Sequence, residues 1–61
     1  MTDVLIVEDR ESLRRGLAET LTQHGLSVAT AADTYEARRA LSRDSFAVVL
    51  TDLKLPAGSG F

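Results

Sequence analysis

The chain has 61 residues, of which 44% are hydrophobic and 26% are charged, so it is long enough for one small domain and too apolar for a disordered chain. Its formal net charge of −2 gives no basic footprint for nucleic acid or an anionic membrane, and the absence of cysteine excludes disulfides and thiolate zinc sites. No apolar run approaches the roughly 20 residues of a membrane span, so we expect a cytoplasmic protein without a membrane partner.

The first half of the chain predicts a buried strand followed by a helix. Residues 4–7 form a continuous apolar run rich in β-branched side chains, which is typical of a strand covered on both faces. Residues 11–24 predict a helix, with Asp9 as the first N-cap candidate and Ser12 as the second, and with Gly25 as the residue that ends it. One side of this helix carries leucines at a spacing of four residues: Leu13, Leu17 and Leu21.

The second half predicts a strand, a helix and another strand. Residues 26–31 are only weakly hydrophobic, which favours a strand at the edge of a sheet. Residues 33–42 predict a helix that Asp33 caps, with Glu36 at the spacing of a capping box. Residues 47–51 form a second apolar run and predict a buried strand.

The alternation of strands and helices predicts an α/β fold with a three-stranded parallel sheet. The first strand is more apolar than the second, so we expect the strand order 2-1-3, numbered along the chain. Right-handed crossovers then place the two helices on opposite faces of the sheet. The reversal of strand order opens a crevice beyond the carboxyl ends of strands 1 and 3, where open α/β sheets bind ligands. Glu8, Asp9 and Asp52 follow these strand ends.

An acidic crevice of this kind suits a hard cation such as Mg²⁺, which prefers carboxylate and carbonyl oxygens. Like charges in one place are costly without a cation or a shared proton. Asp52 is the better candidate for a nucleophile, because a loop that follows it could approach a phosphoryl donor. Each carboxylate alone has an ordinary structural explanation, with Asp9 as a helix cap and Glu8 favouring the helix dipole. Their joint placement is what points to function.

Two motifs carry a resemblance to a known family. The first is the apolar strand with its acidic pair, residues 4–9, and the second is residues 48–56 with the aspartate at position 52, followed by Ser59-Gly60. With these motifs the chain resembles the amino-terminal half of a response-regulator receiver domain, over essentially all 61 residues. The resemblance implies half of a flavodoxin-like fold, with residues 1–61 as a truncated receiver domain.

The resemblance also implies a role for each matching residue. Asp52 would accept a phosphoryl group from a sensor histidine kinase, which makes the domain a signalling module rather than an enzyme. Mg²⁺ would be held by Asp9, Asp52 and the backbone carbonyl of Lys54, and through a water by Glu8. An output domain, in many relatives a DNA-binding one, would be a further partner. The Ser/Thr and Lys with which the family contacts the phosphoryl oxygens have no counterpart in these 61 residues.

Two other functions stay open on the residues. One is a phosphohydrolase or phosphotransferase with Asp52 as nucleophile, although such enzymes usually need a second aspartate where Lys54 stands. The other is a small α/β interaction module without chemistry. We also expect self-association, because the third strand would be an apolar edge that can pair with its copy about a two-fold axis.

Overall fold

The computed structural model describes residues 1–51 and confirms the predicted alternation of strands and helices. The five elements are β1 (Thr2–Val7), α1 (Glu11–Gln23), β2 (Val28–Ala31), α2 (Thr34–Arg43) and β3 (Phe46–Thr51). The second strand is shorter than predicted, because residues 26 and 27 belong to the connection from α1 rather than to the sheet.

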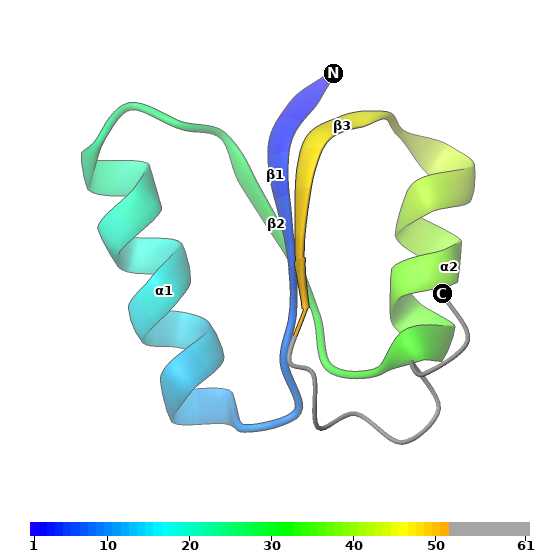
Figure 1. Ribbon diagram of the computed structural model, residues 1–61, viewed down its shortest axis with the longest axis horizontal. Helices are drawn as coiled ribbons and strands as arrows, with labels where there is room; N and C mark the ends of the chain where they lie inside the picture. The colour runs from blue at the N-terminus through cyan, green and yellow to red at the C-terminus, as the bar shows by residue number, and fades with distance from the viewer. Residues whose placement is uncertain (52–61) are drawn as a thin grey trace.

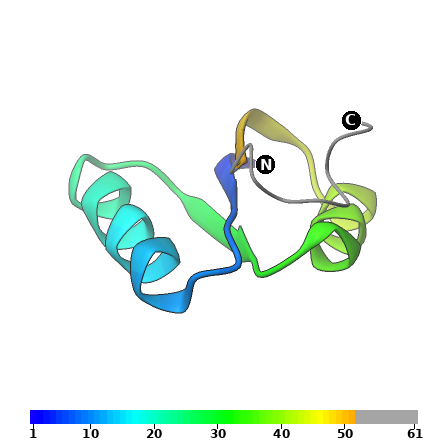
Figure 2. The ribbon, with the colours of Figure 1, turned by 60° about the horizontal axis from the view of Figure 1, so that its bottom comes forward.

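The three strands form one parallel sheet in the order β2-β1-β3, as predicted. Figure 1 views the sheet edge-on, with α1 on one side of the strands and α2 on the other. Figure 2 shows the same separation after rotation, so each face of the sheet carries one helix. β1 is therefore the only strand of the described sheet with a neighbour on both sides, which explains its continuous apolar sequence.

The core lies between the sheet and α2. Among the described residues, four buried side chains form this core: Leu5, Val7, Ala31 and Ala37. Three partly buried side chains pack against them: Ala29, Ala40 and Phe46. Successive side chains of a strand point to opposite faces, so the intervening Val4 and Ile6 of β1 face α1. Both are buried as well, with 5% and 1% of their surface exposed. The centre of the sheet is therefore closed on both faces.

The α1 side is covered less completely. α1 buries none of its residues, and Leu13 and Leu17 of the predicted stripe remain 40% and 37% exposed. Val48 and Leu50 of β3 pair with Val4 and Ile6, so they share this face, and they are 49% and 39% exposed. The helical periodicity correctly identified the apolar side of α1, but in residues 1–51 that side has only part of the partner surface it needs.

The start of α2 is capped as predicted. The carboxylate of Asp33 accepts a hydrogen bond from the backbone N–H of Glu36 at 2.8 Å. The carboxylate of Glu36 reaches back and accepts from the N–H of Ala32 at 2.9 Å, one residue before the cap itself. This variant of the capping box satisfies two backbone donors and fixes the turn between β2 and α2.

Two aspartates accept hydrogen bonds at the amino-terminal edge of the sheet, which is the edge opposite to the one that carries the acidic pair. Asp3 accepts hydrogen bonds from the backbone and the hydroxyl of Ser27, and these bonds hold the pKa of its carboxyl below the usual range. Asp44 accepts a hydrogen bond from the hydroxyl of Thr2, and this bond, together with a hydrogen bond from the backbone N–H of Ser45, lowers the pKa of the Asp44 carboxyl.

Within residues 1–51, neither helix is long and apolar enough to cross a membrane.

One glycine inside α1 and another just after its end allow a matched test of stability. Gly16 lies inside the helix, and a Cβ there would meet open space, so Gly16→Ala is expected to raise the free energy of unfolding by about 0.5–1 kcal/mol. Gly25 has φ of 86° and closes the helix with bonds from its own N–H to Thr22 and from the next N–H to Leu21. Gly25→Ala forces an L-residue into this left-handed conformation and should lower stability by about 1–2 kcal/mol. Urea unfolding followed by circular dichroism measures both, and equal effects would contradict the helix end described here.

Candidate functional site

The carboxyl ends of the strands meet at one edge of the sheet. Val7, the last residue of β1, pairs with Ala31 of β2 on one side and with Thr51 of β3 on the other. The backbone N–H of Glu8 then donates to the carbonyl of Ala31 at 3.0 Å, which extends the pairing by one residue. Glu8 and Asp9 thus leave β1 at the edge where β3 also ends.

Two of the predicted site residues, Asp52 and Lys54, lie outside the described residues. Asp52 follows Thr51 directly in the sequence. Their predicted roles as phosphoacceptor and metal ligands therefore stay predictions. The part of the predicted site that the structure describes is the acidic pair, Glu8 and Asp9.

The carboxylate of Glu8 is buried between β1 and the start of α1. Only 5% of this side chain is exposed, and its Oε2 accepts a hydrogen bond from the backbone N–H of Arg10 at 2.9 Å. The Nε of the Arg10 guanidinium lies 3.4 Å from the same oxygen. The charge of Glu8 is thus balanced by a cation of the chain itself, which is the usual condition for a buried carboxylate.

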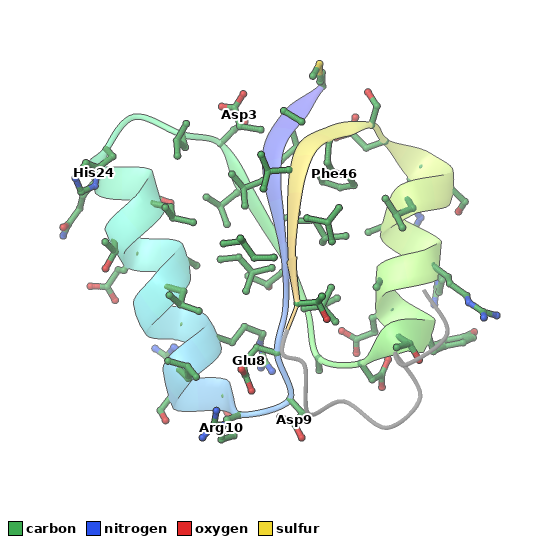
Figure 3. All side chains as sticks on the ribbon, in the orientation of Figure 1. Asp3, Glu8, Asp9, Arg10, His24 and Phe46 are labelled. Carbon is green, nitrogen blue, oxygen red and sulfur yellow. The ribbon has the colours of Figure 1, made fainter. Side chains whose placement is uncertain are left out.

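The carboxylate of Asp9 points away from that of Glu8. Figure 3 shows Glu8 turned toward α1 and Asp9 projecting beyond the end of β1. Asp9 is exposed, and its carboxylate makes no hydrogen bond or ion pair with any residue in the range 1–51. The acidic pair therefore consists of one buried, neutralised carboxylate and one open to solvent.

The start of α1 corrects two expectations from the sequence. The N-cap is Arg10, not Asp9 or Ser12, and no side chain caps it. Adjacent arginines such as Arg14-Arg15 usually mark a solvated helix face, yet Nη1 of Arg14 donates to the backbone carbonyl of Glu8 at 2.9 Å. Arg10 and Arg14 together hold the turn that carries the acidic pair. The only signal for these two contacts in the sequence was the short spacing of both arginines from Glu8. This spacing is informative only because the side chain of Glu8 is turned toward α1.

The carboxylate oxygens of this edge are the type of ligand that a hard divalent cation takes. Within residues 1–51, no group of three or more histidine, cysteine or acidic side chains is arranged to hold a metal. The acidic pair supplies two carboxylates, and magnesium usually takes only one or two from a protein and keeps waters in its other positions. Asp9 is exposed and available for that role, whereas Glu8 is already held by Arg10.

Comparison with known proteins identifies the family. Residues 4–61 match the model of the response regulator receiver domain. The chain is 43% identical over 56 residues to the response regulator protein PilR of Pseudomonas aeruginosa, covering 92% of this chain and 13% of PilR. It is 43% identical over 60 residues to the sensory transduction protein RegX3 of Mycolicibacterium smegmatis, covering 98% of this chain and 26% of RegX3.

A third relative is the C4-dicarboxylate transport transcriptional regulatory protein DctD of Pseudomonas aeruginosa, 37% identical over 59 residues, which are 97% of this chain and 13% of DctD. The chain thus spans only 13–26% of the length of these three relatives. No solved structure matches it significantly. The family match covers nearly the whole chain and agrees with the strand order and the acidic pair, so the chain belongs to the response regulator receiver domain family.

Proposed function

We propose that this chain is the phosphoacceptor part of a two-component signalling module, with Asp52 as the residue that receives the phosphoryl group. The donor would be a phosphohistidine on a sensor histidine kinase in the cytoplasm. The names of the relatives, which include a sensory transduction protein and a transcriptional regulatory protein, support a signalling role coupled to an output domain, and a DNA-binding output fits the latter name. The whole protein's partners remain part of this proposal, because the chain spans a minor part of its relatives.

The observation that carries the proposal is the parallel register at the edge of the sheet. Val7 and Thr51 are paired residues of adjacent strands. The residue after each is acidic in sequence, Glu8 after Val7 and Asp52 after Thr51. Parallel pairing in this register favours a common acidic crevice at the edge where open α/β sheets bind their ligands.

The proposed reaction is a transfer between two groups without net hydrolysis. A carboxylate oxygen of Asp52 attacks phosphorus, an O–P bond forms, and the P–N bond to the donor imidazole breaks with its electron pair left on nitrogen. That nitrogen is protonated, so an acyl phosphate and a free histidine result. Such a transfer needs positioning and charge stabilisation more than it needs covalent help from the protein.

The acidic pair would hold the divalent cation that this transfer needs. Bound Mg²⁺ would offset the negative charge of the phosphoryl oxygens and of the neighbouring carboxylates. Asp9 is exposed and suited to direct ligation, Glu8 to contact through a water, and the carbonyl of Lys54 is the further ligand that the family pattern proposes. The hydrogen bond from Arg14 to the backbone carbonyl of Glu8 would keep the position of Asp9 fixed relative to β1.

Exposure to a small phosphodonor with Mg²⁺, followed by intact mass measurement, tests the proposal. The chain is expected to gain the mass of one phosphoryl group, and Asp52→Asn is expected to lose this adduct because an amide oxygen is a far weaker nucleophile. Asp33→Asn is the matched control, since it makes the same chemical change and asparagine caps a helix as well as aspartate does. An adduct that persists in Asp52→Asn, or no adduct in the unchanged chain, would refute the assignment.

The same sample separates the proposal from the two other candidate functions. Repeated turnover of a phosphate ester would favour a phosphohydrolase, whereas a signalling module forms one adduct per chain and stops. If the folded chain forms no adduct and binds no Mg²⁺, the small interaction module would be the remaining candidate function. The position two residues after Asp52, where such hydrolases usually have an acid, is Lys54, and this favours the signalling module.

We also propose that β3 pairs with the β3 of a second copy in the 61-residue chain. β3 lies at an edge of the described sheet, and three consecutive side chains are 39–49% exposed: Val48, Val49 and Leu50. Edge strands are usually protected by charged residues or proline, and β3 contains neither. A two-fold axis would make the new pair antiparallel and give the strand order 2-1-3-3-1-2.

A further inference from the structure

The contact between Glu8 and Arg10 has a consequence for cation binding. The side chain of Glu8 is 5% exposed, and that of Arg10 is 59% exposed. One carboxylate oxygen, Oε2, accepts from both the backbone N–H and the Nε of Arg10. The positive guanidinium of Arg10 therefore already contacts the carboxylate of Glu8, one of the two residues of the acidic pair.

Only one of the two contacts from Arg10 to Glu8 depends on the side chain of Arg10. The bond from the backbone N–H, 2.9 Å long, exists for any residue at this position except proline. The contact from Nε, at 3.4 Å, exists only with arginine and brings a full positive charge. Replacing the side chain would thus remove the charge while the backbone N–H and the Arg14 bond to the carbonyl of Glu8 continue to hold the turn.

A divalent cation at the acidic pair and the Arg10 guanidinium would compete for the same negative charge. Like charges repel, and because the Arg10 side chain is 59% exposed, dissolved salt screens this repulsion in part. We propose that Arg10 is a positioning residue that sets the affinity of the site for Mg²⁺, by holding Glu8 against α1 and by opposing the second positive charge. This inference depends on the proposed function, because it concerns the cation that phosphoryl transfer would use.

The test is a Mg²⁺ titration of the 61-residue chain followed by amide chemical shifts of residues 8–10. Arg10→Gln is expected to bind Mg²⁺ roughly three- to tenfold more tightly than the unchanged chain, since one opposing charge has been removed near the site. Arg15→Gln is the matched control. It makes the same change on α1, where Arg15 pairs with Glu11 at 3.5 Å in an exposed contact, so its affinity should stay within about twofold.

Two further readings separate a charge effect from a structural one. The difference between Arg10→Gln and the unchanged chain should shrink at high salt, because ions screen the repulsion. Arg10→Lys retains a positive charge and should bind Mg²⁺ more weakly than Arg10→Gln. The same spectra report whether each variant keeps the fold, through the dispersed amides of β1.

The outcomes distinguish this inference from the proposed function. Equal Mg²⁺ affinities in the unchanged chain and Arg10→Gln, both folded, would overturn the role of Arg10 and leave the phosphoacceptor proposal standing. Binding that is detectable only in Arg10→Gln would be the strongest support. If neither folded chain shows shifts at residues 8–10, both the role of Arg10 and the magnesium part of the proposed function are refuted.

Discussion

Leu5→Ala is expected to remove a large share of the chain's free energy of unfolding. Leu5 is 0% exposed in the central strand and belongs to the core cluster with Val7, Ala31 and Ala37. Truncating a fully buried leucine costs about 2–5 kcal/mol, the sum of lost transfer free energy and the cavity left behind. A chain of 61 residues has a total stability of only about 3–9 kcal/mol at typical values per residue. The single change therefore removes a large share of it.

Urea unfolding followed by far-ultraviolet circular dichroism measures this effect. Leu41→Ala is the matched control, because Leu41 lies on α2 with 46% of its surface exposed and the same atoms are removed. Its loss should stay below about 1 kcal/mol, as for other partly exposed positions. Similar losses for the two variants would contradict a core centred on β1 and α2.

Val48→Lys is expected to convert the associated chain to monomers. Val48 is 49% exposed, more than Val49 and Leu50 at 39% each, so a lysine there costs the folded monomer little. In an antiparallel pair of β3 strands the two new charges would lie near the two-fold axis and repel each other. We expect the dissociation constant to rise at least about tenfold, which corresponds to about 1.4 kcal/mol.

Sedimentation equilibrium at micromolar concentration provides the measurement. Thr22→Lys adds the same charge at an exposed position of α1, away from β3, and should leave association unchanged. Two results would count against pairing through β3. One is an unchanged chain that sediments as a compact monomer, and the other is an equal loss of association in both variants.

Much of the fold could be predicted from local signals. The apolar run of β1 indicated a strand covered on both faces, and the weaker β2 indicated an edge, because burial on two faces demands a continuous apolar sequence. Gly25 and Asp33 correctly identified a helix end and a helix start, since each acts through its own backbone neighbourhood. These features depend on residues a few positions apart, so the sequence contains them in full.

The acidic turn after β1 was predicted less well. The order of elements and the likeness to receiver domains singled out Glu8 and Asp9, and the register of β1 with its neighbours agrees with their placement at the edge of the sheet. Which of the two is exposed was not predictable, because it depends on where α1 lies over the sheet. The contacts of Arg10 and Arg14 with Glu8 depend on the same packing, so composition and spacing did not predict them.

The amino-acid sequence by itself determined the elements, their parallel order and the acidic residues at the strand ends, because periodicity, capping and crossover handedness act locally or by general rule. Only the tertiary structure decided that Glu8 is buried against an arginine while Asp9 faces solvent, and that the leucines of α1 are half covered. The physical reason is that burial and charge pairing depend on which surfaces meet in space, and residues far apart along the chain supply those surfaces.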